Sequence, residues 1–405
     1  MNIDLILLLI FGVTLLILMI LGRKNAELEK IAFPFLYLYM YKTKIGLKAM
    51  DTISKKFKKS LGYVGTISII TGFIGMFTIL SYLLFGTYKF FFQNQPSPIQ
   101  LLLPGVVQVP GIPNLSFFHW IIAIFVLAGV HEFSHGVFAR LRKIKIKSSG
   151  FAIFGVILPI IPAAFVEPDE KQLANASKKT QLEVLSAGAF ANIVTAALTF
   201  LLFICLIAPA ANSTMDYVGV QIAGFDEISP TMESGMQVGE EIVMIQGNEI
   251  TRIEDFISAI GKVEPYERIT IQTENSTYNV LTAEHPEDSE RAYLGVQVTP
   301  SKQTYRADLL QKVGMFPLQV LTWIKLMFFW IFVANLGVGL FNLLPISILD
   351  GGRMSYIALE KIMKDEKKAE KIWKVISTSL LAIILILLLP QFYNLLIAPI
   401  IGLLF

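Results

Sequence analysis

Two histidines and a glutamate stand in an H-E-x-x-H pattern, His131-Glu132-Phe133-Ser134-His135. On an α-helix with about 3.6 residues per turn, His131 and His135 lie one turn apart on nearly the same face, so both imidazoles can converge on one metal ion. Glu132 then lies beside any water on that metal. Zinc lowers the pKa of a bound water to roughly 7, and a neighbouring carboxylate can take the proton as the hydroxide attacks a carbonyl. The pattern therefore predicts hydrolysis of a peptide bond.

The same three side chains could instead form a buried polar cluster between helices. The pattern lies at the end of a long apolar run. Ionisable groups inside membrane-spanning segments are costly and normally mark a functional site or path. The apolar setting therefore favours the metal site over the structural cluster.

A catalytic zinc ion usually has three protein ligands and keeps one position for water. The chain has four histidines and one cysteine. His119 precedes His131 on the same predicted helix by roughly 18 Å at 1.5 Å per residue, and His285 lies in a polar segment away from the apolar runs. The third ligand is therefore expected to be a carboxylate or the thiol of Cys205.

Asp350 is the outstanding candidate for this third ligand. It stands in the sequence Asn342-Leu-Leu-Pro-Ile-Ser-Ile-Leu-Asp350-Gly351-Gly352. Pro345 interrupts a helix there, and the two glycines predict a tight turn, so the aspartate can point back into a helix bundle. The alternative is an Asp-Gly turn at the surface.

The composition predicts an integral membrane protein. Hydrophobic residues make up 54% of the 405 residues and charged residues 16%, which excludes an ordinary soluble domain. The single cysteine excludes an intrachain disulfide, and the net charge of +3 gives no reason to expect nucleic-acid binding. Six apolar runs are long enough to cross a hydrocarbon core of about 30 Å. They cover about Ile3–Leu21, Tyr63–Phe85, Phe117–Phe138, Leu182–Ala208, Phe316–Leu344 and Trp373–Leu389.

Basic residues predict the topology. Lysines and arginines are concentrated in residues 23–60, 140–147 and 361–371, whereas the proline-rich segment 96–113 is nearly free of them. By the positive-inside tendency, the basic segments are cytoplasmic and the proline-rich segment is external. The H-E-x-x-H pattern then lies within the membrane, nearer the cytoplasm. The tyrosines of residues 37–41 could line the membrane interface or form a merely packed aromatic segment.

The apolar stretch 150–167 cannot be an ordinary spanning helix, because Gly155, Pro159 and Pro162 break it. Irregular backbone at membrane depth is tolerated where protein or a water-filled cavity covers it, so we expect a re-entrant hairpin beside the metal. An apolar loop packed under the bundle is the alternative. In the next span, the small residues 186–191 allow close helix packing and precede Asn192, whose amide could also merely join two helices.

Residues 212–301 form a polar insert with alternating apolar positions, a helix-like segment at Ile253–Ile260, and strand-like segments at Ile269–Gln272 and Thr277–Leu281. The insert resembles a PDZ domain, a fold that adds a peptide strand to a sheet edge and holds the peptide's terminal carboxylate. Either Tyr217–Val220 or Tyr293–Val296 could supply the carboxylate-binding loop, and a steric filter would have the same sequence features. The predicted topology places this insert outside the cell.

Together the motifs resemble the site-2 protease family of intramembrane zinc metalloproteases. The resemblance rests on H-E-x-x-H, on N-x-x-P-x-x-x-x-D-G at Asn342–Gly351, on the small-residue segment ending at Asn192 and on Phe165-Val166-Glu167. It covers nearly all of the chain from about Phe117.

The resemblance implies specific roles. His131, His135 and Asp350 would be the ligands of one catalytic zinc ion and Glu132 the general base. Asn192 and Asn342 would bind the substrate backbone or the oxyanion, and the hairpin would pair with an unwound substrate strand. The substrates would be single-span transmembrane proteins.

We therefore expect a polytopic α-helical membrane protein of about six spans with a re-entrant β-hairpin and an inserted α+β PDZ domain, placed in the lipid bilayer of the cell membrane. The expected parts are an N-terminal membrane region with a basic cytoplasmic loop (1–115), a first part of the catalytic core (116–211), an extracytoplasmic PDZ domain (212–301) and a second part of the core (302–405).

Two other functions compete with proteolysis. The first is a catalytically silent membrane adaptor that gathers partners, such as peptide C-termini, through its PDZ domain. The second is a transporter that uses Glu132 and Asp350 as a proton path, although the sequence has no inverted repeat that would support it.

Overall fold

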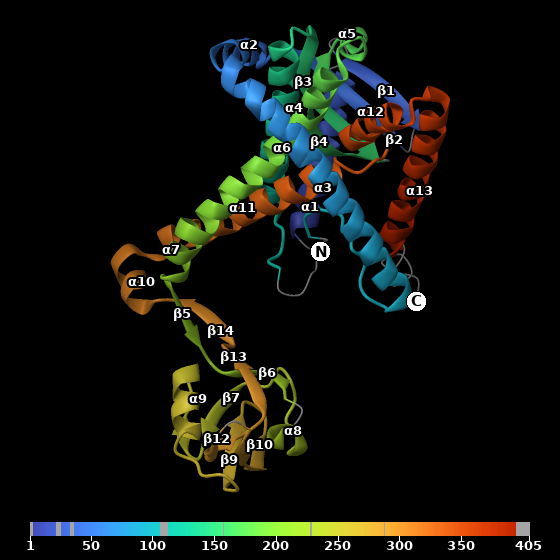
Figure 1. Ribbon diagram of the computed structural model, residues 1–405. Helices are drawn as coiled ribbons and strands as arrows, with labels where there is room; N and C mark the ends of the chain where they lie inside the picture. The colour runs from blue at the N-terminus through green and yellow to red at the C-terminus, as the bar shows by residue number, and fades with distance from the viewer. Residues whose placement is uncertain are drawn as a thin grey trace, which may run out of the picture. The chain divides into compact units, whose positions relative to one another are not determined.

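The computed structural model describes residues 3–21, 26–32, 36–105, 112–156, 158–226, 229–286 and 288–393. The chain divides into two compact units (Figure 1). The first unit contains Met1–Leu206 and Ile324–Phe405, and the second contains Ile207–Trp323. The two units are described separately below.

Among the described residues, six helices are long and apolar enough to cross a membrane, as the apolar runs predict. They are α1 (Ile3–Leu21), α3 (Lys58–Phe92), α4 (Phe117–Leu141), α6 (Lys178–Leu202), α11 (Met315–Phe341) and α13 (Glu366–Phe392). A π-helical turn at Phe203–Ile207 and α7 (Ala208–Asn212) continue α6. Three shorter helices are α2 (Leu47–Lys56), α5 (Glu170–Ala174) and α12 (Asp350–Met363).

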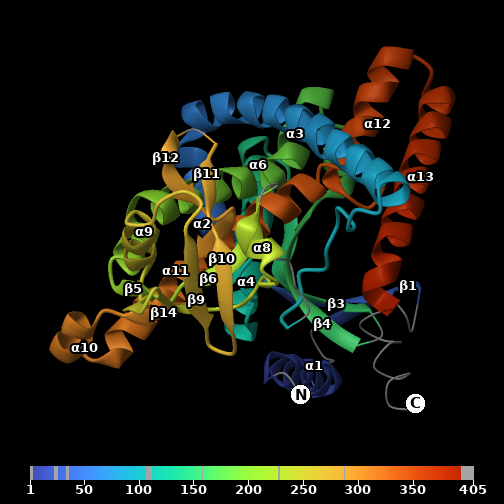
Figure 2. The ribbon, with the colours of Figure 1, turned by 90° about the horizontal axis from the view of Figure 1, so that it is seen from below.

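An antiparallel sheet of four strands lies among these helices (Figure 2). The expected hairpin is present as β3 (Ile146–Val156) and β4 (Leu158–Pro168). The basic segment between the first two spans, residues 23–60, contains β1 (Ala26–Ala32), β2 (Leu36–Thr43) and α2, which the sequence did not predict. The physical reason is the alternation of leucine and tyrosine in β2, which suits a strand and pairs along the whole of its length with β3.

Strand β4 is at an edge of this sheet, since the strand order is β1-β2-β3-β4. Proline has no N–H for a sheet ladder and is therefore found mainly in edge strands. Pro162 lies in the middle of β4, in register with Ile153 of β3. Only β3 pairs with β4 in this sheet, and the other side of β4 has no strand neighbour among the described residues.

Helices α3, α4 and α6 pack closely because small or short side chains line their contacts. Ser68 of α3 and Ser186 of α6 are fully buried, and their hydroxyl oxygens lie 2.8 Å apart. A Cβ on Gly72 of α3 would lie 2.8 Å from Cε of Met354, and a Cβ on Gly75 would lie 2.6 Å from Cδ1 of Leu343. The small-residue segment of α6 therefore lies inside the bundle, with α3 against one side and α4 against another.

The second unit is an α+β fold around a core of aliphatic side chains. Its helices are α8 (Pro230–Glu233), α9 (Ile253–Ile260) and α10 (Ala307–Val313). Its strands are β5 (Met215–Val218), β6 (Gln221–Phe225), β7 (Ile242–Ile245), β8 (Asn248–Glu249), β9 (Arg268–Thr273), β10 (Thr277–Leu281), β11 (Ala283–His285), β12 (Asp288–Tyr293), β13 (Val296–Thr299) and β14 (Lys302–Tyr305).

The segments of the second unit that the sequence predicts as helix or strand form that structure. The helix-like segment is α9, and the two strand-like segments are β9 and β10, which pair antiparallel with Ile271 opposite Tyr278. The strands are arranged as β10-β9-β7-β8, β13-β6, β14-β5 and β11-β12. The assignment of residues 212–301 to a PDZ domain and the other domain boundaries stay predictions.

Candidate metal centre

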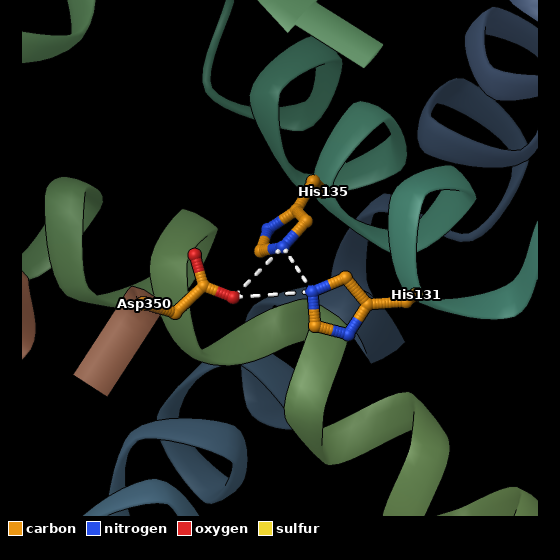
Figure 3. Close-up of side chains that lie close together, drawn as sticks. All are labelled: His131, His135 and Asp350. Atoms are coloured by element: carbon orange, nitrogen blue, oxygen red, sulfur yellow. Dashed lines mark hydrogen bonds and ion pairs between the residues drawn. The ribbon is translucent and has the colours of Figure 1, made fainter. Parts of the chain in front are cut away.

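Helix α4 brings the two histidines of the H-E-x-x-H pattern together. His131 is buried, and the rings of His131 and His135 lie edge to face with centroids 4.7 Å apart. Their Nε2 atoms are 3.0 Å apart and point at the same place (Figure 3). This is the geometry that a spacing of four residues on a helix predicts.

Asp350 completes the cluster from a part of the chain 219 residues away. Its Oδ2 lies 3.1 Å from Nε2 of His131 and 3.2 Å from Nε2 of His135. The expected tight turn at the two glycines is wrong, because Asp350 is the first residue of α12 and Gly351 and Gly352 continue its first turn.

The two glycines are needed at the start of α12 because the preceding chain passes against it. A Cβ on Gly351 would lie 2.0 Å from the carbonyl oxygen of Leu343, and one on Gly352 would lie 2.0 Å from that of Ile346. The N–H of Gly351 also donates to the carbonyl of Asn342 at 2.8 Å. This close backbone packing sets the position from which Asp350 reaches the histidines.

The three ligand atoms fit zinc in chemistry and spacing. Two imidazole nitrogens and one carboxylate oxygen are a common donor set for catalytic zinc, which keeps its fourth position for water. Tetrahedral zinc with bonds of about 2.0–2.1 Å spaces its ligand atoms by roughly 3.3 Å. The spacings of 3.0–3.2 Å among His131, His135 and Asp350 are close to that value, so these residues could hold the ion.

Helix α6 contacts the other nitrogen of each imidazole. Nδ1 of His135 lies 2.7 Å from the carbonyl oxygen of Val184, which accepts its hydrogen. Nδ1 of His131 lies 3.0 Å from the amide Nδ2 of Asn192. A hydrogen bond behind a metal-ligating histidine fixes the ring and directs its free nitrogen at the metal, and the Val184 carbonyl makes such a bond with His135.

Gly188 of α6 gives the imidazoles the space they occupy. A Cβ at this position would lie 2.4 Å from Nε2 of His135 and 2.7 Å from Nε2 of His131. Sequence reasoning identified the small-residue segment as a helix-packing face but did not assign Gly188 to the metal centre. The only signal was its place one turn before Asn192.

Glu132 faces the edge strand of the sheet. Its Oε2 accepts a hydrogen bond of 3.0 Å from the N–H of Val166 in β4. The predicted general base is therefore held between the helix that carries the histidines and the strand that was expected to contact substrate.

An ion pair with a buried carboxylate joins the C-terminal end of α4 to α6. Glu183 is fully buried, and both of its carboxylate oxygens accept hydrogen bonds from the guanidinium of Arg142, with Nη2 and Oε1 2.7 Å apart. Glu183 immediately precedes Val184, whose carbonyl orients His135. The sequence did not predict the pairing of Glu183 with Arg142, because Glu183 is a single acidic residue in an apolar run.

The end of β4 is tied to the other strands of the sheet by charged side chains. Glu167 accepts a hydrogen bond of 2.6 Å from the Ser148 hydroxyl of β3, and its carboxylate lies 3.5 Å from Nζ of Lys42 in β2. Lys42 in turn pairs with Glu27 of β1. The N-terminal strands therefore help to hold the part of β4 that contacts Glu132.

A cavity of about 1380 Å³ in the first unit has the metal centre in its wall. It exceeds the range of about 300–1,000 Å³ that is usual for small-molecule pockets. His131, Glu132, His135 and Asp350 line one part of it, and most of the remaining wall is apolar. That wall includes Ile161, Ala163 and Ala164 of β4, Trp330 and Val338 of α11, and Ile384 and Leu388 of α13.

The other candidate residues from the sequence lie outside the ligand cluster. Asn342 lines the same cavity but is not among the three residues whose ligand atoms lie together. His119 is buried with its Nδ1 2.6 Å from the hydroxyl of Ser116, three turns before His131. His285 packs on Tyr293 in the second unit, and Cys205 is exposed. Neither of the other two histidines nor the thiol joins the cluster.

Comparison with known proteins finds a family model, a relative and a solved structure that resemble parts of this chain. A family model described as peptidase family M50 matches residues 119–387. An uncharacterized protein of Methanocaldococcus jannaschii is 30% identical over 336 residues, which cover 80% of this chain and 78% of that protein. The PDZ domain of the SdrC-like protein of Listeria monocytogenes is similar at 16% identity with a TM-score of 0.19, over 24% of this chain and 94% of that domain.

Replacing Gly188 with alanine is expected to abolish metal binding, because the new methyl group would occupy the space between the two imidazoles. Elemental analysis of the purified protein measures the bound zinc. Gly129→Ala is the matched control, since a Cβ at that position on α4 meets nothing within 4 Å. Equal zinc contents in the two variants would contradict this account of the centre.

Proposed function

We propose that this chain, which belongs to peptidase family M50, is a zinc-dependent endopeptidase. It would cleave transmembrane segments of other proteins. The observation that carries the proposal is the convergence of His131, His135 and Asp350 beside Glu132, at one wall of a large and mostly apolar cavity. Six apolar helices and the family match together suggest a multi-pass membrane protein.

The proposed chemistry assigns one role to each side chain of the centre. His131, His135 and Asp350 would hold zinc, which when bound lowers the pKa of a water to roughly 7 and polarises the scissile carbonyl. Glu132 accepts a proton from the attacking water and passes it to the amide nitrogen of the departing segment. The hydrogen bond from Val166 fixes one oxygen of Glu132 and leaves the other oxygen for the proton.

The edge strand β4 indicates how a substrate segment could bind in the cavity. The backbone groups of a transmembrane helix are bonded to each other, so a protease must unwind the segment and satisfy those groups elsewhere. Strand β4 has β3 on one side, lines the cavity and contacts the general base through Val166. We propose that the unwound segment pairs with β4 by strand addition, near Ala163 and Ala164.

The topology and the second unit complete the proposal. We propose that the metal centre lies toward the cytoplasmic side of the cell membrane and the second unit on the other side, and the distribution of basic segments supports this topology. We propose that this unit is a PDZ domain that binds a peptide C-terminus or restricts which proteins approach the membrane core. The support is the sequence pattern of residues 212–301 and its α+β fold.

Glu132→Gln is expected to lower cleavage of a single-span reporter by about 10²-fold or more, since an amide cannot take the proton but can still accept the Val166 hydrogen bond. The zinc content should stay that of the wild type. Reporter cleavage in liposomes measures the effect, with Glu249→Gln, at an exposed position in the second unit, as the control. Turnover near the wild-type rate would contradict the proposed mechanism.

Asp350→Ala is expected to lower the affinity for zinc, because only the two histidine ligands of α4 remain. Competition with a chromogenic chelator measures that affinity without any substrate. The exposed Asp288→Ala in β12 is the matched control. An affinity equal to that of the control would remove Asp350 from the ligand set.

A further inference from the structure

The amide of Asn192 is fully buried behind His131. Its Nδ2 lies 3.0 Å from Nδ1 of His131. Its other polar atom, Oδ1, is also buried and has no hydrogen-bond partner among the described residues. One buried amide thus meets an imidazole through its NH2 group and leaves its only acceptor, Oδ1, without a hydrogen bond.

The protonation of a metal-binding imidazole makes this arrangement unfavourable. A ring nitrogen that binds a metal carries no hydrogen, so the hydrogen of the neutral ring lies on the other nitrogen. Because Nε2 of His131 faces His135 and Asp350, Nδ1 is the donor. An N–H donor opposite an amide NH2 group makes no hydrogen bond. The oxygen and nitrogen of an asparagine amide differ only by a rotation of 180°, and the hydrogen-bond network decides between them.

We propose that Asn192 is a positioning residue for the zinc ligand His131, with its Oδ1 accepting the hydrogen of Nδ1 and its NH2 group turned to the place that Oδ1 has here. The inference rests on the proposed function, and it differs from the substrate or oxyanion role that the family resemblance implies. The oxyanion role needs the NH2 group, whereas the positioning role needs the oxygen.

One face of α6 is built to receive the H-E-x-x-H helix. Val184, Gly188 and Asn192 are spaced by one turn each and therefore lie along the same face. The first supplies a carbonyl to Nδ1 of His135, the second gives both rings space, and the third meets Nδ1 of His131. Both rings then present Nε2 to the metal for the same reason, a fixed acceptor at Nδ1.

A neighbouring glycine keeps Asn192 in this position. A Cβ on Gly339 of α11 would lie 2.9 Å from Cβ of Asn192, so α11 can pack against α6 at this level only without a side chain there. The side chain of Asn192 is therefore enclosed by α4 and α11, and its amide can rotate in place but has little room to move away.

Two substitutions separate the oxygen from the nitrogen. Asn192→Asp keeps an acceptor for Nδ1 and removes the NH2 group, as in the carboxylate–histidine–zinc arrangements of other proteins. Asn192→Leu has a similar size and removes both polar atoms. Asn335→Leu is the matched control, because Asn335 is also fully buried but its amide donates to the carbonyl of Ile331 on its own helix.

The test is the zinc affinity of the purified full-length protein in detergent, measured by competition with a chelator. Asn192→Leu is expected to bind zinc about 10–100-fold more weakly, whereas Asn192→Asp and Asn335→Leu bind it as the wild type does. If Asn192→Leu does not give a monodisperse protein, Asn192→Ala replaces it, because a shorter side chain needs no new space.

Two results would overturn the proposal: wild-type affinity in the Leu or Ala variant, or an equal loss of affinity in the Asp variant. Reporter cleavage by Asn192→Asp then tests the oxyanion role separately, since that variant lacks the NH2 donor. The affinity measurement contains no substrate. A failure of the proposed protease function would therefore appear as absent cleavage in the wild type, and a failure of the positioning role would appear in zinc binding.

Discussion

The close contact between α4 and α6 is the constraint on which the rest of the first unit depends. Two imidazoles from one face of α4 fill the space between the helices, and this is possible only because Gly188 has no side chain there. The ion pair between Arg142, at the end of α4, and the buried Glu183 of α6 joins the same two helices. Removing the partner of a buried carboxylate is strongly destabilising, so this pair stabilises the contact between the two helices.

The other functional groups are brought to this contact by backbone packing. Asp350 reaches the histidines because Gly351 and Gly352 allow α12 to begin directly against the preceding chain. Glu132 meets the N–H of Val166 because β4 lies along α4, and β4 is held in turn by strands from the N-terminal region. That region lies outside the residues matched by the family model, yet it supplies half of the strands in the sheet that supports the general base.

Local patterns predicted the parts of the structure that depend on local physics. The six apolar helices follow from run length, and the meeting of His131 with His135 follows from helical spacing. The nearness of Asp350 came from counting the remaining ligands. The strands β1 and β2 were missed because a strand is defined by its partner, and β3 is more than 100 residues away. The first turn of α12, the role of Gly188 and the partner of Glu183 were missed for the same reason, since each depends on a contact between distant segments.

The central claim is that zinc held by His131, His135 and Asp350 hydrolyses a peptide bond inside a transmembrane segment. The most direct measurement is mass-spectrometric mapping of the products that the reconstituted protein makes from a single-span substrate, before and after zinc removal with a chelator. The account predicts new chain ends within the spanning segment, lost on zinc removal and regained when zinc returns. Cleavage that persists without zinc, or that falls only outside the segment, would contradict it.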